Sequence, residues 1–176
     1  MNETLKVLEE RRSCRKFKPD MITEEELNSV IRAGTFAPTG MGKQSPIIIA
    51  VTNKETRDKI AKENAKIAGW KEDFDPFYGA PVILIVLANR GVNQEIGTYL
   101  YDGSLVMGNM LNAAESLGLG SIWIEFFDTE KLKQEFNLDR NIEPICLIPI
   151  GYVADDYNGN PMHNVRKNIE DIVEYK

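Results

Sequence analysis

Four cationic side chains lie within the seven residues RRSCRKF, from Arg11 to Phe17, in a 176-residue chain whose formal net charge is -6. Guanidinium groups bind phosphate through paired N–H donors, and a nearby hydroxyl adds a further hydrogen bond. The set Arg11, Arg12, Ser13 and Arg15 therefore suits a phosphate monoester. A solvated charge run at the end of a helix would have the same composition, so the residues alone leave both interpretations open.

A second segment with binding potential is APTGMGKQSP, residues 37–46, whose glycines let backbone N–H groups come close to a ligand. It is not a phosphate loop, because that motif needs glycine at Ala37 and a hydroxyl residue at Gln44. The stretch GLGSIW, residues 118–123, is not a dinucleotide fingerprint either, because Trp123 stands where the third glycine belongs and a strand follows. Neither segment predicts a nucleotide site by itself.

The remaining reactive side chains argue against a self-contained catalyst. His163 is the sole histidine and lies in a polar tail, which disfavours a Ser/His/Asp triad. Cys14 and Cys146 form no CxxC pair and no zinc-ligand spacing with His163, so we expect inert thiols in a reducing compartment and no metal. A protein without its own nucleophile or metal can take its chemistry from a cofactor, and the arginines favour one that carries phosphate.

Composition predicts one globular domain over residues 1–176, with 43% hydrophobic and 27% charged residues. The acidic balance disfavours nucleic acid and anionic membranes as partners, so a nucleic-acid patch over 11–18 is the weakest interpretation of the arginines. The first residues, MNETLKVLEERR, are charged throughout, and the chain has no apolar stretch near ~18 residues that would cross a bilayer. We therefore expect a cytoplasmic protein.

Apolar spacing and capping signals predict five helices, over 3–12, 23–34, 54–68, 102–120 and 128–136. Thr23 and Glu26 are spaced as a capping box, and Asp128 is an expected N-cap. The fourth helix has few charges, so we expect it to be nearly enclosed. The tail, residues 165–176, is either a helix or an arm.

Four strands are expected in the same chain. The continuous apolar runs 46–52 and 81–88 predict strands covered on both faces at the centre of a sheet. Residues 121–127 and 145–153 predict two more, with Pro149 at a bulge or an edge. The order of elements indicates an α+β fold with a mixed sheet.

Five segments together resemble one family. In chain order they are RRSCRKF, APTGMGKQSP, GAPVILIVLA, SLGLGSIWIE and the late VRK, and the set is similar to the FMN-dependent nitroreductase family over nearly the whole chain. The resemblance implies a nitroreductase-like sandwich with a mixed, mainly antiparallel sheet flanked by helices. It also implies an intertwined homodimer with two FMN sites at the subunit interface. The short connection 88–99 marks a short-chain member, whose substrate preference does not carry over.

The resemblance assigns the early arginines to the cofactor. Arg11 and Arg12 would contact the FMN phosphate or ribityl chain together with Arg166 from the tail. Ser13 would donate a hydrogen bond nearby, and Arg15 would reach the pyrimidine side of the flavin.

Two further segments would complete the cofactor site. Gln44 stands where the family's loop glutamine is expected. The residues that would cover the flavin from the other subunit are Pro38, Thr39 and Gly40. Those that would lie beside the N5 edge are Ile124, Glu125 and Phe126.

The implied activity is that of an FMN-dependent oxidoreductase with a ping-pong mechanism. NADH or NADPH would deliver hydride to flavin N5, and a nitroaromatic, a quinone or a related electron-poor acceptor would then take it. No catalytic side chain is assigned. A non-catalytic flavin-binding sensor or carrier is the alternative, which the short connection 88–99 keeps open.

Overall fold

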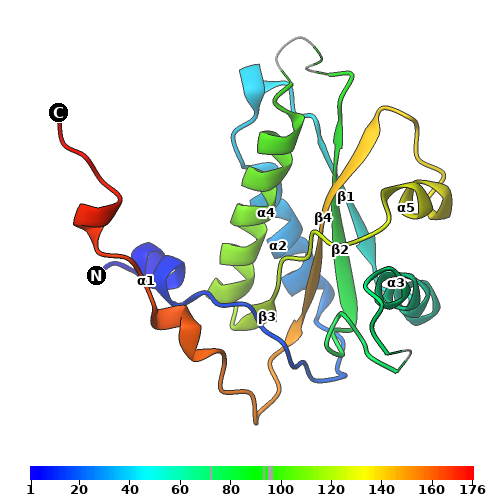
Figure 1. The fold of residues 1–176 in the computed structure, drawn as a ribbon, viewed down its shortest axis with the longest axis horizontal. Coiled ribbons are helices and arrows are strands. Elements are labelled where there is room, and N and C mark those ends of the chain that lie inside the picture. Colours follow the sequence, from blue (N-terminus) through cyan, green and yellow to red (C-terminus); the bar gives the residue numbers. More distant parts are fainter. Residues whose placement is uncertain (72, 93, 95–96) are drawn as a thin grey trace.

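A single four-stranded sheet with helices on both faces forms the body of the protein (Figure 1). The computed structural model describes residues 1–71, 73–92, 94 and 97–176. The strands have the spatial order β1-β2-β4-β3 and are antiparallel at all three pairings. Their bounds are β1 (Pro46–Val51), β2 (Val82–Asn89), β3 (Leu119–Ser121) and β4 (Ile142–Tyr152). The predicted α+β fold with a mainly antiparallel sheet is confirmed, and its parallel part is an isolated bridge between Ser13 and Ser121.

Helices α2 and α4 cover one face of the sheet, and α3 and α5 cover the other (Figure 1). The helices are α1 (Glu3–Glu10), α2 (Glu24–Thr35), α3 (Lys54–Ile67), α4 (Tyr99–Ser116) and α5 (Thr129–Glu135). Short 3-10 turns add η1 (Gly40–Gly42), η2 (Pro161–Asn164) and η3 (Ile169–Asp171). The capping box of Thr23 with Glu26 and the N-cap at Asp128 are both present, as the sequence predicted.

Strand β2 forms the centre of the core. Its residues from Val82 to Ala88 are all buried, and alternate side chains enter the two hydrophobic clusters on opposite faces. The prediction of a strand covered on both faces is thus confirmed for β2. It is wrong for β1, which pairs with β2 alone among the described strands and leaves Ile47 41% exposed at the edge.

Strand β4 lies inside the sheet, so the prediction of a bulge or edge at Pro149 is wrong. The bulge occurs at Ile145, which the register skips between Val86 and Leu87 of β2. The Pro149 carbonyl accepts a hydrogen bond from the Ile122 amide at 3.2 Å, so the proline nitrogen faces the same side. Regular pairing with β3 has already ended there, which explains why a missing N–H is tolerated.

The strand predicted over 121–127 is much shorter than expected. On this side of β4, the described pairing consists of β3, which ends at Ser121, and an isolated bridge between Ile124 and Leu147. Beyond the bridge the chain turns toward α3, where the Phe126 carbonyl accepts a hydrogen bond from the Asn64 side chain at 3.0 Å. The segment 122–127 is therefore mostly irregular backbone lying along the sheet.

Helix α4 is half buried in this chain, contrary to the prediction that it is nearly enclosed. Val106, Met110 and Ala114 pack against the sheet, while Tyr101 and Leu105 on the other side are 71% and 47% exposed. Low charge predicted burial of the whole helix, but the chain itself covers only one of its faces.

Both termini extend from the body (Figure 1). Helix α1 ends at Glu10, so Arg11 and Arg12 lie after it and not in its last turn as the sequence suggested. The tail, residues 165–176, is an arm with one short 3-10 turn, η3, which is one of the two predicted alternatives. Among the described helices, none is long and apolar enough to cross a membrane.

Candidate functional site

The segment that carries the early arginines is fastened to the edge of the sheet. The Cys14 amide donates to the Ser121 carbonyl at 2.9 Å, and Phe17 forms an isolated bridge with Val153. Cys14 and Phe17 are buried, and burial raises the pKa of the Cys14 thiol. Because these two residues point inward, Arg15 between them is exposed. The segment therefore presents its guanidinium groups from a fixed backbone.

Residues 157–163, which precede the tail, contact the arginine segment and the helix α1 before it. The Tyr157 hydroxyl donates to the Ser13 carbonyl at 2.8 Å, and His163 Nε2 lies 2.8 Å from the Glu9 carbonyl of α1. Gly159 has a φ of 74°, and a Cβ added to it would lie 2.8 Å from an Arg12 guanidinium nitrogen. Residues far apart in the sequence thus meet around the arginines.

One of the four clustered cations is neutralised inside the chain, because Lys16 forms an ion pair with Asp156. The candidate phosphate-binding arginines differ from Lys16, because none of them has a carboxylate within 4.0 Å among the described residues. These arginines are Arg11, Arg12, Arg15 and Arg166. Arg12 donates to the Glu10 carbonyl at 3.5 Å, and Arg166 donates to the Val165 carbonyl at 2.9 Å. The described contacts leave these guanidinium groups able to bind an external anion, and phosphate is an anion that guanidinium groups bind well.

The arginines also create a local field at the end of α4. Burial raises the pKa of the half-buried Glu115 carboxyl, while Arg12 and Arg11 act in the opposite direction. Glu115 lies in the last turn of α4, so the effect of Arg11 and Arg12 on its pKa shows that the arginine segment lies near this end of the helix.

The loop with Pro38, Thr39, Gly40 and Gln44 is held at the other end of α4. The Gly40 amide donates to Asp102 Oδ1 at 2.8 Å, and the Gln44 amide donates to Thr39 Oγ1 at 3.0 Å. Gln44 has a φ of 51°, which is rare for a residue other than glycine and shows that the loop is tightly constrained.

These two predicted parts of the site do not meet within one chain. Asp102 marks the loop and Glu115 marks the arginine segment, thirteen residues apart in α4. At 1.5 Å per residue the separation along the helix is about 20 Å. Figure 1 shows η1 and the N-terminal segment at opposite ends of α4.

The segment Ile124, Glu125 and Phe126 lies close to the arginine segment in the same chain. It follows Ser121, which is bridged to Ser13. Glu125 and Phe126 are exposed. The structure therefore brings 11–15 and 124–126 to the same edge of the sheet, whereas 38–44 lies elsewhere.

Sequence reasoning missed two anchoring residues. Asp102 is 2% exposed and accepts hydrogen bonds from Gly40 and from the Ser45 hydroxyl, at 2.8 and 2.6 Å. The sequence signal for Asp102 was an isolated carboxylate in a weakly charged helix.

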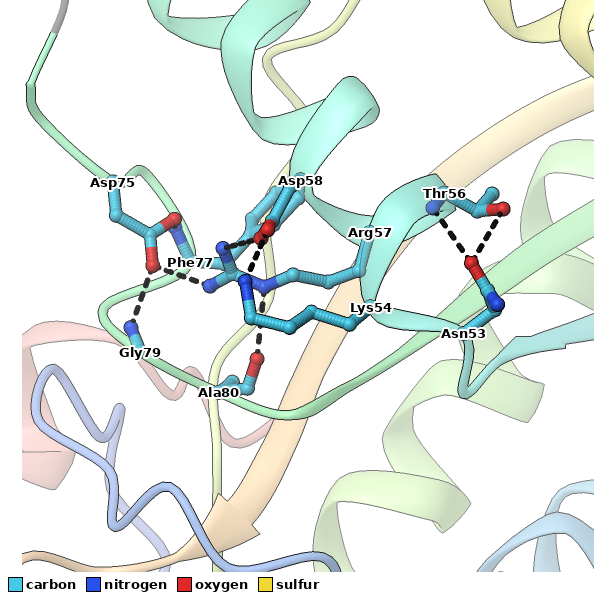
Figure 2. A network of polar contacts seen from close by, with 9 residues as sticks. All are labelled: Asn53, Lys54, Thr56, Arg57, Asp58, Asp75, Phe77, Gly79 and Ala80. Carbon is cyan, nitrogen blue, oxygen red and sulfur yellow. Dashed lines mark hydrogen bonds and ion pairs between the residues drawn. The ribbon is translucent and has the colours of Figure 1, made fainter.

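Arg57 is 8% exposed and pairs with Asp75 in the loop after α3, as Figure 2 shows. The many charges of α3 gave no signal that this one is buried.

A cleft lies between α3 and α5, apart from the arginine segment. Ion pairs join Lys59 to Glu135 and Lys131 to Glu63 across it. Its charges are satisfied internally, in contrast to those of the arginine segment.

The fold is that of the nitroreductase family. The sequence model of the Nitroreductase family matches residues 8–152, and the chain belongs to this family. The FMN reductase [NAD(P)H] of Bacillus subtilis is 30% identical over 175 residues, covering 88% of this chain and 68% of that protein. A putative NADH dehydrogenase/NAD(P)H nitroreductase of Methanothermobacter thermautotrophicus is 28% identical over 158 residues, covering 88% of this chain and 79% of that protein.

Solved structures agree over the full length. A nitroreductase family protein from Clostridium difficile 630 has a TM-score of 0.84 and 27% identity, covering 100% of this chain and 99% of that one. A nitroreductase with bound FMN from Desulfitobacterium hafniense DCB-2 has a TM-score of 0.81 and 27% identity, with the same coverage.

Proposed function

We propose that this protein is an FMN-dependent oxidoreductase that uses NADH or NADPH to reduce a small electron-poor acceptor such as a nitroaromatic or a quinone. The observation that carries the proposal is a group of arginines at the edge of the sheet, none of which is ion-paired with a carboxylate among the described residues. The names of the relatives support the same chemistry, namely an FMN reductase [NAD(P)H] and a nitroreductase with bound FMN.

The arginines hold the phosphate end of the cofactor in this proposal. Arg11, Arg12 and Arg166 bind the phosphate, and Arg15 supplies positive charge at the pyrimidine edge, where added electrons place negative charge. These residues would hold FMN, whose bound form would supply the redox chemistry between NADH or NADPH and the acceptor in a ping-pong sequence. The backbone of 124–126 borders the reacting edge, with Ser13 nearby. No side chain of this site needs to act as a strong base.

Phosphate contacts alone do not retain the cofactor. A hydrogen bond to a charged group contributes about 1.5–3 kcal/mol, so three of them contribute roughly 5–9 kcal/mol. Nanomolar binding requires about 12 kcal/mol. The remaining free energy comes from burial of the ring system, at about 25 cal/mol per Å² of apolar area, which requires walls on both sides.

A second copy of the chain supplies the missing wall in this proposal. The loop residues Pro38, Thr39 and Gly40 lie about 20 Å along α4 from the arginine segment of their own chain, so we assign them to the site of the other subunit. Large apolar side chains exposed in this chain support a homodimer. They are Phe36, Met41, Tyr101, Leu105, Val165, Ile169 and Ile172.

The test is the flavin content of purified protein. We expect FMN to be released on heating, and its absorbance to bleach when NADH or NADPH is added anaerobically. Arg11→Ala combined with Arg166→Ala should give a folded, colourless dimer, because losing two charged contacts weakens binding by about 10²- to 10⁴-fold. Arg140→Ala is the control, since Arg140 is also exposed and is assigned no phosphate contact.

Two results would contradict the proposal. A double variant that keeps its full flavin complement would remove the phosphate assignment. A flavin that is bound but never bleached by either dinucleotide would favour a sensor or carrier over an enzyme.

A further inference from the structure

The segment between β4 and the tail, residues 154–163, runs back along the arginine segment, and we call it the strap (Figure 1). At its start, the Ala154 amide donates to the Lys16 carbonyl at 3.1 Å. At its end, His163 Nε2 lies 2.8 Å from the Glu9 carbonyl of α1. The strap is therefore attached to the chain on both sides of the candidate phosphate-binding arginines.

The strap fixes the peptide unit that joins Ser13 to Cys14. The Tyr157 hydroxyl donates to the Ser13 carbonyl at 2.8 Å. The Cys14 amide, on the other side of the same peptide unit, donates to the Ser121 carbonyl at 2.9 Å. Because a peptide unit is planar, these two hydrogen bonds leave it little freedom to rotate. The half-buried Tyr157 ring packs against the hydrophobic core, so its hydroxyl is itself held in place.

The Arg12 side chain lies against the backbone of the strap at Gly159. Gly159 has a φ of 74°, and a Cβ added to it would lie 2.8 Å from a guanidinium nitrogen of Arg12 and 3.1 Å from its Cδ. Only glycine adopts this backbone conformation without strain and also leaves this space open. The Gly159 backbone and the hydrogen bond to the Glu10 carbonyl, and not a counter-charge, therefore limit where the guanidinium points.

The contacts of Tyr157 and Gly159 are more than the strap needs to stay attached. Ion pairs of Asp156 with Lys16 and of Asp155 with Lys18 already fasten its first residues. The two additional contacts fall on Arg12 and Ser13, two neighbouring residues of the proposed phosphate site. Donors that are ordered before a ligand arrives bind it at a lower entropy cost.

We propose that Gly159 and Tyr157 are positioning residues for the cofactor phosphate: Gly159 sets the direction of the Arg12 guanidinium, and Tyr157 sets the orientation of Ser13. This inference rests on the proposed function and adds to it the residues that order the phosphate donors. The flavin ring does not use these donors. The strap therefore favours FMN over riboflavin, the same flavin without the phosphate.

The test measures flavin binding by the full-length protein after its FMN has been removed. Fluorescence titrations with FMN and with riboflavin give two dissociation constants, and their ratio reports the contribution of the phosphate. Gly159→Ala should raise the Kd for FMN about 5- to 50-fold, because Arg12 has to move, and leave the Kd for riboflavin within about twofold. Tyr157→Phe keeps the ring and loses one hydrogen bond, so it should raise the Kd for FMN about 2- to 10-fold.

Gly118→Ala is the matched control for backbone strain. Gly118 has a φ of 72°, and no described atom outside its neighbouring residues lies within 4 Å of a Cβ added to it. Both alanine variants should lose thermal stability, because each places a side chain on a left-handed residue. Only Gly159→Ala displaces an arginine, so only it should lower the preference for FMN.

A second control asks whether Gly159 acts through Arg12. In the Arg12→Ala background, the side chain that Gly159→Ala would displace is absent. Gly159→Ala should then change the Kd for FMN by less than about twofold, as expected when two changes affect one contact.

The outcomes distinguish the two proposals. Protein that binds neither flavin refutes the proposed function, and wild-type protein that binds both equally removes its phosphate assignment. A wild-type preference for FMN that persists unchanged in Gly159→Ala and Tyr157→Phe refutes the role of the strap alone. An equal loss of preference in Gly118→Ala, or a full loss in the Arg12→Ala background, overturns the claim that Gly159 acts through Arg12.

Discussion

The anchor at Asp102 can be tested by a stability measurement with a calculable size. Asp102 is buried and accepts two hydrogen bonds, from the Gly40 amide and the Ser45 hydroxyl. Each hydrogen bond to a charged group contributes about 1.5–3 kcal/mol. Asp102→Ala removes both, and relief of the cost of burying a carboxylate offsets part of the loss. We therefore expect the free energy of unfolding to fall by about 3–5 kcal/mol.

Two milder changes isolate the individual contacts. Ser45→Ala removes one hydrogen bond and should cost about 1.5–3 kcal/mol. Asp102→Asn should cost less than about 1.5 kcal/mol, because its carbonyl can still accept from Gly40 while its amide donates to Ser45. In the Asp102→Ala background, Ser45→Ala should cost no more than about 0.5 kcal/mol, since its partner is already gone.

The assay is urea unfolding of FMN-free protein at one fixed protomer concentration, because dimerisation would change the apparent stability. Flavin retention should fall in the same order as stability, since Asp102 holds the loop proposed to cover the cofactor. Equal costs of Ser45→Ala in the wild-type and Asp102→Ala backgrounds would refute the reasoning, because independent sites add and a shared contact does not.

Two further predictions concern the core. Gly103→Ala should lower stability by about 1–3 kcal/mol in thermal denaturation, because its Cβ would lie 2.8 Å from the β-branched Ile145. Gly34→Ala should also lower stability but by less, because its Cβ would lie 2.8 Å from the unbranched, buried Met110 and 3.2 Å from Val106, while alanine gains helix propensity. Burial raises the pKa of Cys146 to about 12, so the folded state keeps a proton that the unfolded state loses. Above about pH 9, the wild type should therefore lose about 1.4 kcal/mol per pH unit more than Cys146→Ala in alkaline urea titrations.

Local sequence signals predicted the elements better than their places in the sheet. The run of β2 and the capping box of α2 are as expected, because burial on both faces and helix capping leave a local pattern. Strand β1 has the same apolar composition but lies at the edge. The position of a strand in the sheet depends on which other strands pair with it. The residues of the strand alone do not determine that pairing.

The failure at 121–127 has a similar cause. Its residues have the composition of a strand, but Asn64 binds the Phe126 carbonyl and draws the chain toward α3. The backbone at Phe126 is thus bonded to a distant helix and not to a neighbouring strand, and the local sequence carries no sign of this contact. The burial of Arg57 could not be predicted for the same reason, because it depends on a contact with Asp75 in the loop after α3.

The candidate site shows where the sequence stops being informative. The order of motifs identified the arginines, but it could not show that Lys16 pairs with Asp156 and leaves the arginines as the available donors. Nor could it show that the loop at Gly40 is fixed to the opposite end of α4 from Arg11. Both facts come from long-range contacts.

Two observations support the proposed homodimer. The Gly40 loop and the arginine segment lie at opposite ends of α4, and one face of that helix is exposed. A twofold dimer contact is self-complementary, so a subunit that lends its loop to a partner receives the partner's loop in return. In the proposed homodimer, two identical sites would form, each with the arginine segment of one chain and the Gly40 loop of the other. Tyr101 and Leu105, on the face of α4 that its own chain leaves open, would be covered in the same contact. In the proposed dimer the low charge of α4 would match a burial that the single chain does not provide.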